Sequence, residues 1–163
     1  QVDSPGASTA LALSPELLGR RAREKAVRQK VRGGVLPFGS AEDLEDAIFQ
    51  ELTNAGAKPI MVTLESRTAN GAASRDRRPS QAKISVSLNT IATSGDTGFE
   101  VLEERLMVVW LIVGKYQSLG NVQFEDVRVK IPPPLAWNRS YEGRELALLW
   151  EQQIEAARLF PEE

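Results

Sequence analysis

The chain has 163 residues, of which 42% are apolar and 26% charged, a composition typical of a single globular domain. It contains no cysteine and no histidine, which excludes disulfides, thiolate metal sites and the commonest general base and metal ligand. Only carboxylate, lysine or oxygen-ligand chemistry remains, and we expect no bound cofactor and no catalytic or metal-binding residues.

Charge is distributed unevenly along the chain. Residues 1–40 carry seven Lys/Arg and three Asp/Glu, a net charge of +4, whereas residues 41–163 carry thirteen and nineteen, a net charge of −6. This asymmetry predicts a basic N-terminal arm, residues 1–39, attached to a body formed by residues 40–163. The arm would dock on something acidic, either nucleic acid or the body of a neighbouring copy.

After a small and polar lead over residues 1–13, the sequence predicts a helix at 15–32. Ser14 is a suitable N-cap, Pro15 favours the first helical position, and Gly33 and Gly34 would end the helix. Its apolar stripe is narrow, so we expect the helix to pack on a partner or to lie along the surface. Its basic residues are candidate contacts for a partner or for nucleic acid: Arg20, Arg21, Arg23, Lys25, Arg28, Lys30 and Arg32.

A second helix, residues 41–55, is predicted by Ser40 as N-cap and by Leu44, Ile48 and Leu52 at helical spacing. Its outer face is acidic. An alternating strand follows at 59–65, in which Ile60, Val62 and Leu64 would face one way. The polar loop 67–81 then offers four further candidate contacts, Arg67, Arg75, Arg77 and Arg78, and is either a nucleic-acid contact or a surface loop.

A second alternating strand is predicted at 83–89, followed by a turn at 93–98. The most apolar stretch, residues 106–113, has eight apolar residues without a break. Its Val, Ile and Trp residues favour a strand, and the lack of alternation predicts burial of both faces, by helices on one and by a neighbouring subunit on the other. The stretch is too short to cross a membrane, and we expect the protein to have no contact with a membrane.

The last strand ends at Ile131, with a bulge predicted near Glu125 because the alternation changes parity there. The prolines at 132–134 would end the sheet, and a final helix is predicted at 140–159. This order predicts an α+β fold, in which an antiparallel meander of about four strands carries helices on one face and the basic N-terminal helix extends as an arm.

Motifs for chemistry are weak. The chain has no phosphate-binding glycine loop, and Glu103-Glu104 and Glu125-Asp126 are adjacent pairs that would point to opposite faces of a strand. The segment 126–130 has the acid and lysine of a nuclease strand without the required spacing. An enzyme is therefore the third hypothesis, after a structural subunit and a nucleic-acid-binding module.

The element order resembles that of the tail-completion and tail-terminator proteins of tailed phages and related contractile particles. The segments that carry this resemblance are the helix at 41–55, the strand at 59–65, the loop at 67–81, the hairpin of 83–91 with 106–116, and the C-terminal helix. The resemblance implies a non-enzymatic, ring-forming subunit of a virion, or of its cytoplasmic assembly, that meets copies of itself and other structural subunits. The alternative is a nucleic-acid-binding module that uses the basic helix.

Overall fold

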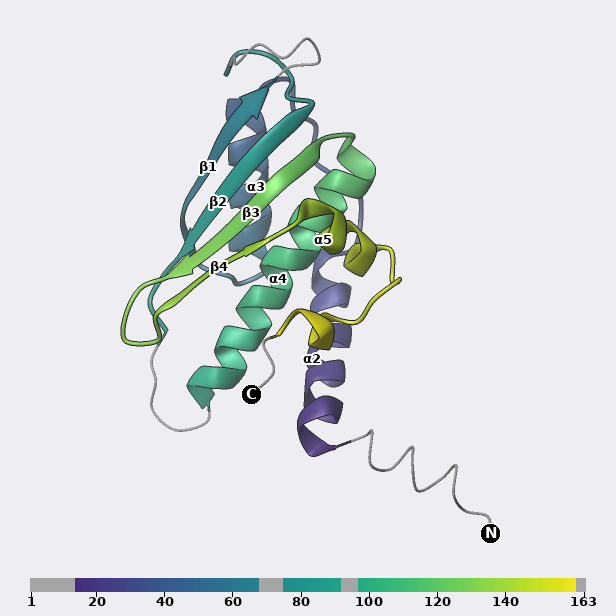
Figure 1. Ribbon diagram of the computed structural model, residues 1–163, viewed down its shortest axis with the longest axis vertical. Helices are drawn as coiled ribbons and strands as arrows, with labels where there is room; N and C mark the ends of the chain where they lie inside the picture. The colour runs from purple at the N-terminus through teal and green to yellow at the C-terminus, as the bar shows by residue number, and fades with distance from the viewer. Residues whose placement is uncertain (1–13, 68–74, 92–96, 161–163) are drawn as a thin grey trace.

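The computed structural model describes residues 14–67, 75–91 and 97–160, which form an α+β fold (Figure 1). The lead 1–13, part of the loop 67–81 and most of the turn 93–98 lie outside the described residues. No helix in the described ranges combines the length and the apolar character needed to cross a membrane. The elements in chain order are α2 (Pro15–Val31), α3 (Ala41–Asn54), β1 (Pro59–Arg67), β2 (Gln81–Leu88), α4 (Thr97–Gly120), β3 (Gln123–Ile131), β4 (Trp137–Tyr141), α5 (Gly143–Trp150) and the 3-10 turn η1 (Ala156–Leu159).

The first two predicted helices are confirmed together with their N-caps. The Ser14 hydroxyl accepts a hydrogen bond from the backbone N–H of Leu17 at 3.2 Å, and the Ser40 hydroxyl accepts one from Asp43 at 3.1 Å. Each bond satisfies a donor that the first turn of a helix leaves without an intrahelical partner. In α3, the residues at helical spacing are all buried, as their periodicity predicts.

The predicted central strand is wrong, because residues 106–113 form the middle of helix α4. Every side chain of this stretch is at most 1% exposed. A helix that is apolar on all sides shows no alternation of apolar and polar residues, and neither does a strand buried on both faces. Complete burial was therefore correctly predicted, but the type of element was not. The cover comes from the same chain, since α2, α3, α5 and β3 all contact α4.

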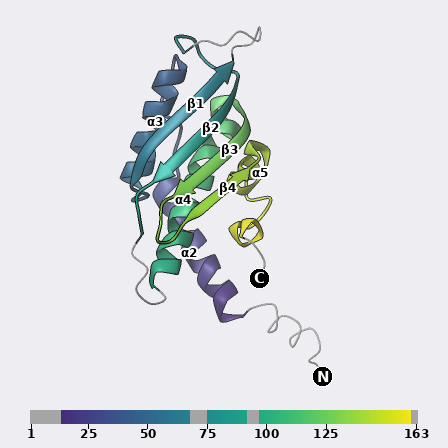
Figure 2. The same cartoon turned by 60° about the vertical axis from the view of Figure 1, so that its left-hand side comes forward.

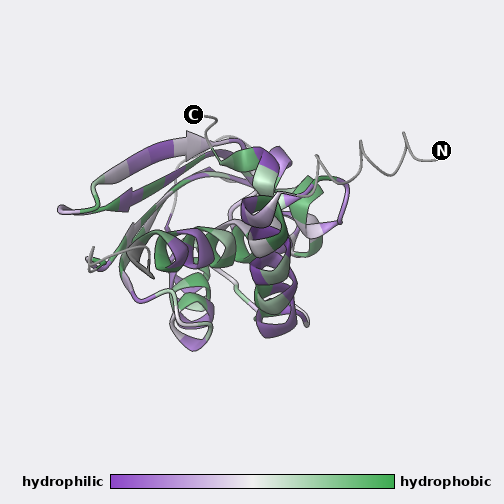
Figure 3. Ribbon diagram, turned by 90° about the horizontal axis from the view of Figure 1, so that it is seen from below, coloured by the Kyte–Doolittle hydropathy of each residue, from purple (hydrophilic) through white to green (hydrophobic). Residues whose placement is uncertain are grey.

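The sheet is mixed, so the predicted antiparallel meander is also wrong. Among the described residues its strand order is β1-β2-β3-β4, with β1–β2 and β3–β4 antiparallel and β2–β3 parallel. Parallel neighbours need a crossover connection, which α4 provides between β2 and β3 (Figure 2). Buried and exposed residues alternate along β2, and Figure 3 shows the strands as one layer with helical segments to one side.

Three predictions for the C-terminal part of the chain differ in outcome. The predicted bulge is confirmed: Ala82 pairs with Phe124 and Lys83 with Asp126, which leaves Glu125 as the extra residue. The sheet does not end at the prolines, because β4 returns as an edge strand beside β3. The predicted final helix is broken into α5 and η1, with Gln152 at a φ of 64° between them.

The core is centred on α4, which approaches α5 unusually closely. A Cβ atom at Gly114 of α4 would lie 2.0 Å from the backbone oxygen of Leu146 in α5. Only a residue without a side chain allows two helix backbones to come this near. The buried residues Val27 and Val31 of α2 and Phe38 of the following linker belong to the same core.

Candidate functional site

The basic residues of α2 face acidic residues of α4 in the same chain. Arg20 Nε lies 2.9 Å from Glu103 Oε2, and Arg23 binds the other oxygen of the same carboxylate. The side chain of Glu103 is 2% exposed, so one buried carboxylate holds two guanidinium groups. At the surface of the same contact, Lys30 Nζ lies 2.8 Å from Glu104 Oε2.

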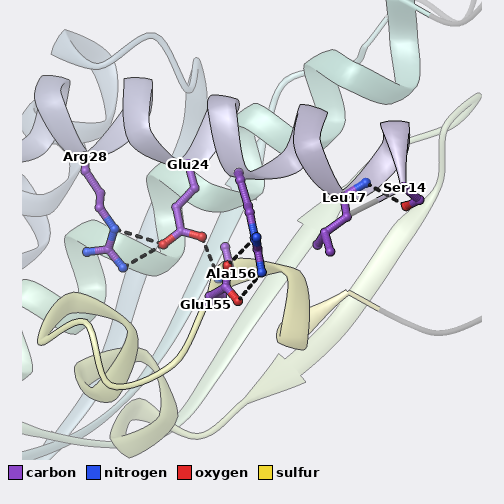
Figure 4. A network of polar contacts seen from close by, with 7 residues as sticks. Ser14, Leu17, Glu24, Arg28, Glu155 and Ala156 are labelled. Atoms are coloured by element: carbon purple, nitrogen blue, oxygen red, sulfur yellow. Dashed lines mark hydrogen bonds and ion pairs between the residues drawn. The ribbon is translucent and has the colours of Figure 1, made fainter. Parts of the chain in front are cut away.

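Two other arginines of α2 bind the C-terminal segment. Figure 4 shows part of this contact, with Arg28 joined to Glu24 and Glu24 joined to Ala156. Arg21 donates two hydrogen bonds to Glu155, at 2.8 and 3.2 Å. Arg28 pairs with Glu24 on its own helix and donates to the backbone oxygen of Leu149 at 2.5 Å, at the end of α5. Glu24 in turn accepts a hydrogen bond from the backbone N–H of Ala156 at 2.9 Å.

The remaining two candidate contacts, Lys25 on α2 and Arg32 directly after it, are exposed and form no ion pair or side-chain hydrogen bond with the described part of the chain. Five of the seven candidate contacts on α2 therefore already bind groups of the same molecule. Two unpaired cations attract the phosphates of a nucleic acid only weakly.

The arginines of the loop 67–81 also fall into two groups, those bound within the molecule and those left exposed. The Arg75 guanidinium pairs with Glu45 of α3 at 2.6 Å and donates to the backbone oxygen of Leu64 at 3.2 Å. The hydrogen bond with Glu45 raises the pKa of Arg75 above its usual value. Since the Leu64 N–H also donates to Glu45 at 2.7 Å, these two residues cover part of the free edge of β1.

Arg78 stacks 4.3 Å from the centre of the Phe38 ring and donates to the backbone oxygen of Gly120 at 2.7 Å. It therefore anchors the linker after α2 to the end of α4. Arg67 and Arg77 are exposed and form no ion pair with other described residues. The structure thus does not bring the four arginines of this loop together into one basic patch.

A buried polar cluster joins the three long helices. Lys115 Nζ, 1% exposed, lies 2.5 Å from Glu51 of α3 and donates to the last carbonyl of α2, that of Val31, at 3.0 Å. The Tyr116 hydroxyl donates to the other Glu51 oxygen and accepts from the N–H of Leu36 at 2.9 Å. Burial and the hydrogen bond to Glu51 raise the pKa of Tyr116. The cluster is internally satisfied, so it serves to fasten α2 and α3 to α4.

Acidic residues do not converge on a metal site in the described ranges, where no group of three or more carboxylates has the required arrangement. Glu103 and Glu104 form ion pairs with α2, whereas Glu125 is the bulged residue of β3 and Asp126 follows it.

A strongly apolar hollow lies at the end of the sheet where β1 and β4 begin and β2 and β3 end, and this end of the sheet is at the lower left of Figure 1. It is open to solvent and has a volume of about 520 Å³. Ile60 and Met61 are each 54% exposed beside it, although the later outward positions of β1 are polar. We call it the apolar cleft; its principal lining residues are Ile60, Met61, Leu88, Ile131, Pro132 and Trp137.

This cleft was not predicted, because the alternation of the strand placed Ile60 on the inner face with Val62 and Leu64. The pairing of β1 with β2 shifts between Pro59 and Met61, which turns Ile60 outward. A signal was present, since four successive apolar or proline residues at 59–62 interrupt the alternation of the rest of the strand.

The described residues thus define an α+β protein that exposes an apolar cleft at one end of its sheet. Comparison of the chain with models of protein families, with curated proteins and with solved structures finds no match.

Proposed function

We propose that the protein is a non-enzymatic structural subunit that assembles with other copies of itself through the apolar cleft. The observation that carries this proposal is the exposure of Ile60 and Met61, 54% each, next to the half-buried Trp137. Large apolar side chains gathered in a hollow at the surface are typical of protein–protein contact sites.

The support comes from the cleft and not from the basic arm. The arginines of α2 are paired within the molecule, so α2 does not need a neighbouring copy to neutralise them. A subunit in a ring or tube needs a rigid body and a contact surface on it, and the cleft is formed by the ends of four paired strands. A tail-completion or tail-terminator protein of a phage-like particle is the particular kind of subunit we propose.

Light scattering after size-exclusion chromatography of the full chain tests self-assembly. We expect a mass that is a multiple of 17.9 kDa, and we expect the double variant Ile60→Ser/Met61→Ser to fall towards the monomer. Leu119→Ser is the matched control, because Leu119 is 53% exposed and lies at the far end of α4. A wild-type protein that remains a monomer at high concentration would contradict the proposal.

Binding of nucleic acid by the segment 15–32 has less support, because among the described residues its only unpaired cations are Lys25 and Arg32. We expect no binding of DNA or RNA at about 50 mM salt, where such contacts are strongest. Tight binding that weakens steeply with added salt would favour the nucleic-acid module instead.

A further inference from the structure

The outer face of α3 carries an acidic stripe with an exposed aromatic residue. Glu42, Asp46, Phe49 and Thr53 follow one another at spacings of four, three and four residues, so they lie along one side of the helix. All four are exposed, and Phe49 is 37% exposed. The carboxylates of Glu42 and Asp46 form no ion pair with the described part of the chain.

The border of the apolar cleft is basic, opposite in charge to the stripe on α3. The described residues that line it include no Asp or Glu, and Lys130 is exposed at its wall. Arg139 lies over the Trp137 ring at 5.2 Å from its centre, which places a second cation beside the apolar surface. The cleft therefore fits an apolar side chain that is accompanied by carboxylates.

We propose that α3 of one copy docks on the apolar cleft of the next copy, with Phe49 in the hollow and Asp46 facing Lys130. This inference rests on the proposed function and names the surface that fills the cleft. It commits to a second copy because the same chain carries both an acidic stripe with an apolar residue and an apolar hollow with a basic border, and like-charged surfaces would repel.

The two surfaces belong to different elements, so the contact is between unlike patches. Contacts of this kind join subunits head to tail and give rings where the rotation closes. The other exposed aromatic side chain, Phe99, lies at the start of α4 beside Glu100 and adjoins residues outside the described ranges, so α3 is the better-defined partner surface.

Charge exchange tests the pairing directly. The exposed residues Asp46 and Lys130 are changed singly, Asp46→Lys and Lys130→Glu, and together in one chain, and the assembly constant of each protein is measured by sedimentation equilibrium. We expect each single variant to weaken assembly by about tenfold or more, because like charges would then face each other at every interface. The double variant should recover most of the loss, and so should an equimolar mixture of the two single variants.

Matched controls separate this pairing from a general effect of charge. Glu125→Lys and Lys25→Glu change exposed residues away from α3 and the cleft, and should leave the assembly constant within about twofold of wild type. Circular dichroism of every variant should match that of the wild type.

The outcomes distinguish the two proposals. Single variants that assemble like wild type, or a double variant that fails to recover, overturn the docking of α3 even if Ile60→Ser/Met61→Ser still abolishes assembly; in that case the cleft remains the contact but another surface fills it. A wild-type chain that never assembles overturns both.

Discussion

Helix α4 makes two contrasting contacts, one with α5 and one with α2. Against α5, the two backbones come so close at Gly114 that a Cβ atom there would lie 2.0 Å from the Leu146 oxygen. Against α2, long charged side chains span the gap, with Arg20 and Arg23 on Glu103 and Lys30 on Glu104. The first contact depends on the absence of a side chain and the second on paired charges.

The difference teaches how a helix with little apolar surface can still belong to a compact domain. In α2, the buried positions are Val27 and Val31, and burial of two valines contributes about 3–6 kcal/mol at most. The ion pairs give the helix a defined position on α4 where apolar packing alone would not. The α5 contact needs no such pairs, because Leu146 and Leu149 are fully buried there.

The largest expected effect is that of Gly114→Ala. Alanine favours a helix over glycine by about 1 kcal/mol, but the new methyl group would meet backbone atoms of Leu146 and Ala147 within 3.1 Å. Backbone atoms cannot rotate away, so overpacking wins and we expect a net loss of about 3 kcal/mol in the free energy of unfolding. Urea denaturation followed by circular dichroism measures it.

Gly19→Ala is the same substitution in α2 and sharpens the comparison. The nearest atoms to its Cβ would belong to the Arg23 side chain, 3.4 Å away. That side chain can move, so we expect a gain of about 0.5–1 kcal/mol from helix propensity. Equal changes in the free energy of unfolding for Gly114→Ala and Gly19→Ala would contradict the proposed difference between the α5 and α2 contacts.

The next effect in size is that of Glu103→Gln, which removes the charge shared by Arg20 and Arg23. Loss of one partner of a fully buried pair costs about 3–5 kcal/mol. Both arginine side chains are 25% exposed and can regain water, so we expect a loss of about 2 kcal/mol. Hydrogen exchange should also show faster opening of α2 than of α5, and unchanged protection of α2 would contradict this account.

The parts of the fold that were predicted from sequence are those specified by neighbouring residues. Ser14 and Ser40 cap helices through bonds to residues three positions away. The bulge at Glu125 follows from a local change of parity. Residues 106–113 show the limit of such reasoning, since complete burial removes the period that separates helix from strand. In the structure this stretch lies inside a 24-residue helix, longer than strands, which rarely exceed about ten residues.

The candidate site was harder to predict because its decisive contacts join distant parts of the chain. Arg20 and Glu103 are 83 residues apart, and Arg21 and Glu155 are 134 apart. A sequence shows that the basic helix and the acidic residues exist but not that they pair with each other. The apolar cleft depends likewise on how β1 pairs with β2, so a shift of one residue at Ile60 moved it from the predicted core to the surface.

The smallest expected effect is that of Glu104→Gln, which removes the exposed pair with Lys30 at the surface of the α2 contact. The two side chains are 42% and 46% exposed, so water and salt weaken their attraction and we expect a loss of about 0.5 kcal/mol at low ionic strength. In about 1 M NaCl, where charges are screened beyond about 3 Å, the loss should vanish. Glu103→Gln should keep most of its effect under the same conditions, because its carboxylate is buried. Unfolding free energies of the three proteins at both salt concentrations measure this; equal salt dependence of the two variants would mean that burial does not separate the inner ion pairs of this contact from the outer one.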